Sequence, residues 1–585
     1  MKRYFFLIAL LILIACKDTK KEKKESFITQ FELSNGTETP VYQEVIDYYI
    51  ELAREFPSIN IQTMGQTDSG YPLHIVTYNA AGDFNFSKLR DQNTIILINN
   101  AIHPGESDGV DATMLLFRDL AKGTVNAPKQ TVLVTIPIYN IGGALNRNTT
   151  TRANQNGPVA YGFRGNARNY DLNRDFIKND TQNARSFAEI FHLVQPDIFI
   201  DNHVSNGADY QYTLTHLFTQ HNKLGGNLGG YLHTQLMPKL EADLAKKEWD
   251  ITPYVNVYNR VPESGFSQFM DSPRYSTGYT SLWNTLGMMV ETHMLKPYKQ
   301  RVEGTYEIMK SMVSIADKDY DSIKNLRKEA FEAFQNSKTY ALNWGIDTTQ
   351  TTVLQFKGFE ADTITSDVTG LPRLKYNTDR PFIKEVVYQN YFKAVNEVEI
   401  PEAYIIPQAW SEVIQLMKYN NIAMKTMVND TLIWVEKYRI TDYKTRPSAY
   451  EGHYLHYNTK VISALDSIAF RKGDIMVKTN QPGIRYLLET LEPEAPDSFF
   501  NWNFFDTILQ RKENFSPYVF EDIAKQMLDS DPELKEAFEA KKLADPDFSS
   551  NAYAQLNWLY EHSAHYEKAH MNYPVYRVPK PTNNP

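Results

Sequence analysis

The feature that most constrains the fold is an alternation of short apolar runs with helical patterns between residues 94 and 290. The runs at 94–99 (TIILIN) and 131–136 (TVLVTI) are typical of parallel strands buried on both faces. Helices are predicted at 108–122 and 181–194, and further strands at 197–201 and 286–290. This repetition predicts an α/β fold with a mixed, mostly parallel doubly wound sheet flanked by helices. Such sheets bind ligands beyond the carboxyl ends of their strands.

The first 26 residues have the composition of an export segment. Residues 4–15 form an apolar run of twelve, too short for a membrane span, which needs about 20 residues. The run ends in Leu13-Ile14-Ala15-Cys16, which resembles the lipobox of bacterial lipoproteins. The resemblance implies a signal peptide at 1–16, lipidation of Cys16, and an exported protein anchored to a bacterial membrane in the periplasm or at the cell surface. An ordinary secretory signal is the alternative. Residues 17–26 lack apolar side chains and are predicted to be a charged tether.

Composition narrows the classes of function and of metal site. A net charge of -9 argues against a nucleic-acid binder, which usually carries a basic patch. The chain has a single Cys, which excludes an intramolecular disulfide framework and a thiolate metal cluster. Any metal must therefore be held by His, Asp and Glu.

The pattern of apolar residues changes near residue 337. Residues 27–336 are predicted to form the first domain, and residues 337–575 an accessory mixed α/β region of one or two domains. In that region we expect strands at 403–406, 431–435 and 474–478, and helices at 411–419 and 482–491. Residues 576–585 are predicted to be a loose tail, because the end of the chain is rich in Pro and Asn.

Metal-binding side chains follow two of the predicted strands. His103 and Glu106 come just after the strand at 94–99, and His203 follows the strand at 197–201. A single His-x-x-Glu spacing arises easily by chance, and a lone loop His is usually a hydrogen-bonded residue. Their shared position at one edge of the sheet is more informative. Two His and one Glu form a catalytic zinc set that leaves a fourth position for water.

A loop between these ligands is rich in Arg and Asn. Residues 163–176 read FRGNARNYDLNRDF. Such a loop is either a solvated surface or a site for an anionic substrate, because Arg binds carboxylates bidentately.

Together these residues resemble the zinc carboxypeptidase family of the carboxypeptidase A type. The specific part is the order of His103-x-x-Glu106, an upstream Arg164, the run Asp171-Leu172-Asn173-Arg174, then His203 and a Glu that closes an apolar strand. The resemblance covers roughly residues 42–318. It implies one zinc ion, held by His103, Glu106 and His203.

The resemblance also implies roles for residues around the metal. Arg164 would stabilise the oxyanion, Asn173 and Arg174 would bind the substrate's terminal carboxylate, Asp171 would orient a ligand His, and Glu291 would be the general base. A mobile Tyr closes over the substrate in this family, and Tyr275 and Tyr279 are both candidates here.

Two positions depart from the family's pattern. Pancreatic-type members carry an Arg inside the His-x-x-Glu motif, where this chain has Gly105, so we expect that carboxylate contact to be missing. Glu291 is followed by Thr292 and His293 instead of an apolar residue. Both differences bear on the form of the substrate more than on the zinc chemistry.

The expected function is that of an enzyme, a zinc metallocarboxypeptidase that removes residues from peptides with a free C-terminus. One alternative keeps the zinc site but changes the substrate to cell-wall peptides or acyl-amino acids. Another is a non-catalytic surface lipoprotein that binds ligands on a peptidase scaffold. The sequence does not determine side-chain preference, natural substrate or oligomeric state.

Overall fold

The computed structural model describes residues 27–580. The predicted signal peptide, the anchor Cys16 and the tether at 17–26 lie outside the described residues, as do residues 581–585. Within residues 27–580, no helix combines the length and the apolar character needed to cross a membrane.

An eight-stranded sheet forms the centre of the first domain, with the order β1-β2-β4-β3-β5-β9-β6-β7. Four neighbouring pairs are parallel (β3-β4, β3-β5, β5-β9 and β6-β7) and three are antiparallel. The predicted mixed, mostly parallel α/β fold is confirmed. The strands are Ile59–Gln66 (β1), Pro72–Tyr78 (β2), Thr94–Asn99 (β3), Thr131–Ile136 (β4), Ile198–Ser205 (β5), Leu214–Phe218 (β6), Ile251–Pro253 (β7) and Leu286–His293 (β9).

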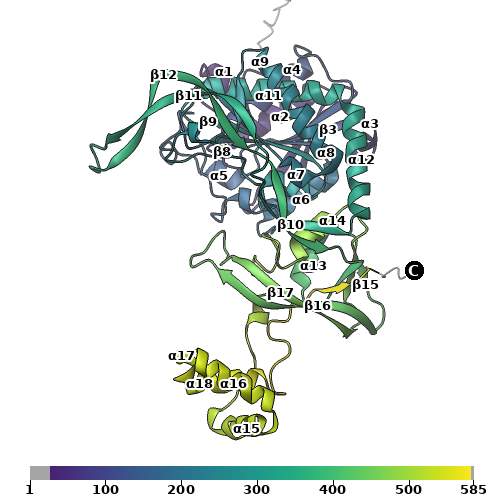
Figure 1. Cartoon of the computed structure of the whole chain (residues 1–585). Coiled ribbons are helices and arrows are strands. Elements are labelled where there is room, and N and C mark those ends of the chain that lie inside the picture. The colour runs from purple at the N-terminus through teal and green to yellow at the C-terminus, as the bar shows by residue number, and fades with distance from the viewer. Residues whose placement is uncertain (1–26, 581–585) are drawn as a thin grey trace, which may run out of the picture.

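Helices lie on both sides of this sheet, with α2, α4 and α11 above it and α6 and α7 below it in Figure 1. The larger ones are Tyr42–Glu55 (α2), Asp108–Lys122 (α4), Gln182–Val194 (α6), Met237–Ala245 (α9), Tyr298–Lys318 (α11) and Tyr320–Asn336 (α12). Shorter helices are Gln30–Leu33 (α1), Phe86–Gln92 (α3), Ile141–Leu145 (α5), His221–Leu224 (α7), Gly226–Tyr231 (α8) and Ser276–Ser281 (α10). Strands β3 and β4 are buried along their whole length, as apolar parallel strands require.

A close approach of α4 to the sheet fixes the loop that precedes this helix. A Cβ at Gly109 would lie 2.4 Å from both Asn100 Oδ1 and Asn202 Cβ. Only glycine therefore lets the first turn of α4 approach the ends of β3 and β5 this closely. The loop at 103–106 is thereby held beside β5.

A long hairpin follows α12 and extends away from the first domain (Figure 1). Its strands, Thr352–Thr365 (β11) and Pro372–Gln389 (β12), form a sheet with the short β8 (Phe266–Ser267). Its base packs through Phe356 and Tyr388 onto Tyr210 of the first domain. Strands Thr339–Ile346 (β10) and Phe392–Glu399 (β13) pair with each other beside it.

A six-stranded sheet forms the C-terminal domain, in the order β15-β18-β14-β19-β16-β17. Its strands are Lys425–Thr426 (β15), Ile475–Lys478 (β18), Ala403–Ile406 (β14), Tyr576–Val578 (β19), Thr431–Thr445 (β16) and His456–Phe470 (β17), with helices Ser411–Tyr419 (α13) and Ile484–Leu491 (α14). The prediction of a loose tail from residue 576 was wrong at its start. Residues 576–578 form β19, which pairs with both β14 and β16.

Four helices form a separate module at the far end of the molecule (Figure 1). They are Pro517–Ser530 (α15), Pro532–Ala544 (α16), Pro546–Ser549 (α17) and Ala552–Glu561 (α18). The module has its own small core, which includes Phe520, Phe538 and Leu559.

Candidate active site

The predicted metal ligands and the predicted base meet at the carboxyl ends of three neighbouring strands. His103 and Glu106 lie in the loop between β3 and α4, His203 lies in β5, and Glu291 lies in β9. His203 and Glu291 are register partners across the β5-β9 pair. The doubly wound order therefore gathers residues separated by up to 188 positions of sequence, 103 to 291, at one edge of the sheet.

His103, Glu106 and His203 form a cluster whose ligand atoms all lie within 4.8 Å of one another. His103 Nδ1 lies 3.2 Å from Glu106 Oε1, and His203 Nδ1 lies 3.1 Å from Glu106 Oε2. Atoms that share a tetrahedral metal at about 2.0–2.2 Å lie roughly 3.3–3.6 Å apart, so these spacings suit a common ion. His103 Nδ1 is also buried without a hydrogen-bond partner. Two imidazole nitrogens and a carboxylate fit a zinc ion.

An aspartate lies behind each of the two histidines. His103 Nε2 is 3.0 Å from Asp171 Oδ1, and His203 Nε2 is 3.0 Å from Asp201 Oδ2. Such contacts fix the orientation of a ligand imidazole and leave its other nitrogen free for a metal. The role of Asp171 behind a ligand His was predicted from the sequence, and that of Asp201 was not. The available signal was its position two residues before His203, which places both side chains on one face of β5.

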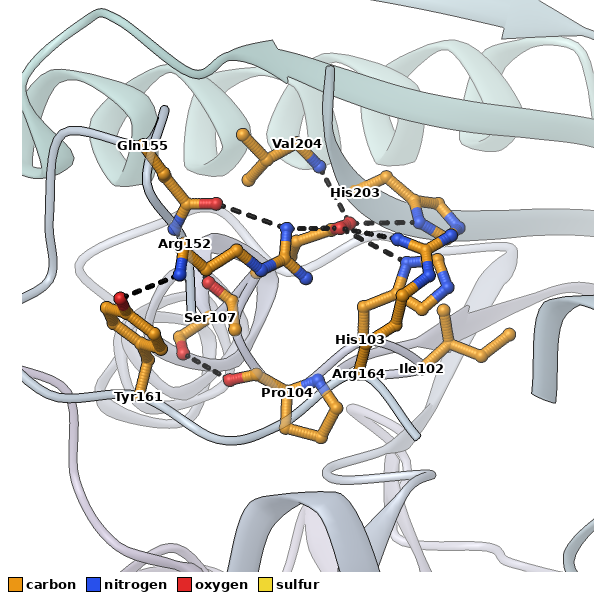
Figure 2. Close-up of polar contacts among 12 residues, drawn as sticks. Ile102, His103, Pro104, Ser107, Arg152, Gln155, Tyr161, Arg164, His203 and Val204 are labelled. Carbon is orange, nitrogen blue, oxygen red and sulfur yellow. Dashed lines mark hydrogen bonds and ion pairs between the residues drawn. The ribbon is translucent and has the colours of Figure 1, made fainter. Parts of the chain in front are cut away.

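Arg152 lies directly against Glu106, a contact that the sequence did not predict. Arg152 Nη1 donates to Glu106 Oε1 at 2.7 Å, and the amide of Val204 donates to Oε2 at 2.9 Å. Burial by itself raises the pKa of Glu106, but the charges of His103 and Arg152 outweigh it and hold the pKa well below its usual value. Figure 2 shows the side chains of His103, His203, Arg152 and Arg164 converging on one carboxylate, which is that of Glu106.

The glycine at position 105 leaves room for the side chain of Arg152. A Cβ at Gly105 would lie 2.5 Å from Arg152 Nε. The guanidinium of Arg152 thus occupies the space that a side chain at residue 105 would need. Arg152 contacts Glu106 and does not line the cavity, so the absence of the extra contact to a substrate carboxylate stays a prediction.

Glu291 is partly exposed to the cavity beside the metal cluster. The pKa of Glu291 is raised to about 7, chiefly by burial. The charges of Glu106 and Asp201 also raise this pKa, and those of His203 and Arg164 lower it. Arg164 lines the same cavity, where its Nε donates to Asp171 Oδ2 at 3.0 Å and its Nη1 lies 3.7 Å from Glu106 Oε1. Its side chain is 44% exposed, so its remaining donors stay accessible to a ligand.

Asn173, Arg174 and Tyr275 line the same cavity of about 420 Å³ as the metal cluster, Arg164 and Glu291. The Arg174 guanidinium lies 4.5 Å from the centre of the Tyr275 ring. The amide of Ser276 donates to Asn173 Oδ1 at 3.3 Å, which joins the two segments. The apolar side chains of Leu217, Phe269 and Met289 also line this cavity.

Tyr279 does not line this cavity. It is fully buried, and its hydroxyl donates to Asn420 Oδ1 at 2.6 Å. Its ring packs against Phe176 and Phe191 in the core of the first domain. The prediction that Tyr279 closes over a substrate is therefore corrected. Tyr279 lies within α10, which is buried along its whole length, whereas Tyr275 precedes the helix.

No known family profile matches the chain. It is similar to the protein named carboxypeptidase 2 of Trichophyton tonsurans, with 23% identity over 82% of this chain and 83% of the relative. The protein of the same name from Trichophyton rubrum is 22% identical over 80% and 84% of the two chains. Among solved structures, a metallo-carboxypeptidase from Burkholderia cenocepacia has 15% identity and a TM-score of 0.37, covering 47% of this chain and 70% of its own.

Proposed function

We propose that the chain is a zinc metallocarboxypeptidase that hydrolyses the last peptide bond of substrates with a free C-terminus. One observation carries this proposal: the His103–Glu106–His203 cluster, Glu291 and the Asn173–Arg174 pair all line one cavity. A metal site, a base and a carboxylate-binding pair at such close range match the needs of this reaction. The similarity to proteins named carboxypeptidase over four fifths of both chains supports a peptidase enzyme.

His103, Glu106 and His203 are the residues that would hold the zinc ion. A zinc ion there supplies Lewis acidity, which polarises a carbonyl group and makes water more acidic. Asp171 and Asp201 keep the Nδ1 atoms of the two histidines directed at the metal position.

Glu291 is the proposed general base. Its carboxylate takes a proton from the attacking water and then delivers it to the leaving amine. Arg164 is the proposed oxyanion partner, since it lines the cavity beside the metal cluster and its side chain is 44% exposed. Donors aimed at the developing negative charge lower the barrier without having to reorganise.

Asn173 and Arg174 are the proposed binding residues for the terminal carboxylate. A guanidinium forms two parallel, charge-assisted hydrogen bonds to a carboxylate, and an amide adds a further donor. Tyr275, whose ring stacks near Arg174, is the proposed residue that closes over the substrate. These binding residues restrict hydrolysis to the last peptide bond, because they hold the terminal carboxylate at a fixed distance from Glu291.

We also propose that the protein is exported and lipid-anchored through Cys16, on the sequence resemblance of residues 13–16 to a lipobox. Metabolic labelling with a fatty-acid analogue would detect the anchor. Cys16→Ser should abolish the label, whereas a label that persists would refute the anchor.

Peptides that differ only at the C-terminal carboxylate test the proposed function. We expect the zinc-loaded protein to hydrolyse the free acid and to leave the C-terminal amide intact, because the amide offers no charge to Arg174. Equal hydrolysis of both peptides would contradict the proposed carboxylate recognition.

A further inference from the structure

The C-terminal domain contacts both segments that carry the proposed substrate-binding residues. One segment, 171–180, holds Asn173 and Arg174, and the other, 274–281, holds Tyr275. Figure 1 shows the C-terminal sheet directly beneath the first domain, with α13 and α14 at the junction. The contacts described below come from the β16–β17 connection at 446–455 and from the loop at 492–505. Asn420, at the end of α13, and Arg485 of α14 also contact the two segments.

Glu451 makes the contact that lies nearest to the site. Its Oε2 accepts a hydrogen bond from the backbone amide of Asp171 at 2.8 Å. The same Asp171 side chain orients His103, and its backbone leads directly into Asn173 and Arg174. Glu451 thus contacts the residue that links the metal ligand His103 to the proposed carboxylate-binding pair Asn173 and Arg174.

The backbone around Glu451 is shaped for this contact. Glu451 and Gly452 both adopt positive φ angles, 50° and 81°. A Cβ at Gly452 would lie 2.5 Å from the Tyr170 hydroxyl, so the turn rests against the segment that it supports. A non-glycine residue at φ > 0 is uncommon, and it persists where surrounding contacts fix it.

Further contacts support the same two segments. His453 Nε2 lies 2.8 Å from Asp180 Oδ2, at the far end of the first segment. Asp497 is fully buried and accepts hydrogen bonds from the amide and Nε of Arg274, at 3.0 and 2.8 Å. Arg274 precedes Tyr275 in the chain. A buried, paired charge of this kind is costly to disrupt, because the partner left behind is unpaired.

We propose that Glu451 is a positioning residue, through which the C-terminal domain fixes the substrate-binding segment 171–174. This inference rests on the proposed function, and it gives the C-terminal domain a role within the catalytic unit. Glu451 does not line the cavity of the site, and it acts only through the backbone of Asp171.

Three full-chain variants test the proposal: Glu451→Ala, Glu451→Gln and the control Glu412→Ala. Glu412 lies on the exposed side of α13 in the same domain. We expect Glu451→Ala to raise KM for a free-acid peptide about tenfold with a much smaller change in kcat. Glu451→Gln should stay within about threefold of wild type, since its amide oxygen accepts the same hydrogen bond. Glu412→Ala should match wild type.

Hydrogen exchange provides a readout that does not depend on activity. The Asp171 amide should exchange at least tenfold faster in Glu451→Ala, with wild-type rates in Glu451→Gln and Glu412→Ala. Wild-type exchange rates and kinetics in Glu451→Ala would overturn the proposal. So would equal losses in Glu451→Ala and Glu451→Gln accompanied by a lower Tm, because Glu451 would then be an ordinary structural contact. Failure of the proposed function is a separate result: the wild-type protein would not cleave, while the exchange measurement would still decide the role of Glu451.

Discussion

His203 and Glu291 are register partners on the neighbouring parallel strands β5 and β9. Side chains at partnered positions point to the same face of a sheet, so a predicted metal ligand and the predicted base stand next to each other. The pairing follows from the strand order, in which β9 is added beside β5 although 80 residues, from 205 to 286, separate them in sequence. Base and metal site are therefore held at a fixed separation by the backbone hydrogen bonds of the sheet.

Glu291→Gln is expected to lower kcat by about 10² to 10⁴, because glutamine has nearly the same shape but accepts no proton. Zinc content should not change, since Glu291 is not one of the three ligands. Steady-state kinetics and metal analysis of the same preparation check both points. Glu303→Gln, at an exposed position of α11, is the control. Wild-type activity in zinc-loaded Glu291→Gln would remove Glu291 from the mechanism.

Arg174→Gln is expected to raise KM for free-acid peptides about 10- to 100-fold, because a charge-assisted hydrogen bond contributes about 1.5–3 kcal/mol. The preference for free acid over amide should shrink by a similar factor. Arg168→Gln is a matched control, since Arg168 lies in the same loop but outside the cavity. A variant at position 174 with an unchanged preference would show that the carboxylate binds elsewhere.

Asp201→Asn is expected to weaken zinc binding about 10- to 100-fold, because the acceptor behind His203 loses its charge. Competition with a chelator of known affinity measures the Kd directly. Asp442→Asn, at an exposed position on β16, is the comparison. If the two variants bind zinc equally well, Asp201 has no part in holding His203 for the metal.

Acid is expected to weaken the contact between the two domains at Asp180. Burial alone raises the pKa of Asp180, but the hydrogen bond with His453 and the charge of Lys178 outweigh it, so the pKa is lowered from 3.8. A carboxylate whose pKa is lower in the folded protein than in the unfolded chain stabilises the fold at a pH above the unfolded-state pKa. This stabilisation is lost as the pH falls through the folded-state pKa. Below about pH 4, wild-type Tm should therefore fall more steeply than that of Asp180→Asn. Parallel Tm curves from pH 6 to 3 would exclude this contribution.

The position of the candidate metal ligands and of the candidate base could be predicted from the sequence. His103, Glu106, His203 and Glu291 each follow or close an apolar strand, and a parallel sheet brings such positions to one edge. The element boundaries were also predictable where the apolar period was strong, as in α4 and β4.

The contacts that the sequence did not predict are those made between distant loops. Arg152 reaches Glu106 across 46 positions, and Glu451 reaches Asp171 across 280. Neither residue belongs to a motif, and each stands in a segment whose course depends on tertiary packing. Strand β19 was missed for the same reason: three residues at the end of the chain become a strand only because β14 and β16 flank them.

A peptide-library digest read by mass spectrometry, with and without a zinc chelator, tests most directly whether the protein is a zinc carboxypeptidase. We expect stepwise loss of C-terminal residues that stops in chelator and resumes when zinc is restored. Internal cleavage, or trimming that continues in the chelated protein, would contradict a zinc carboxypeptidase.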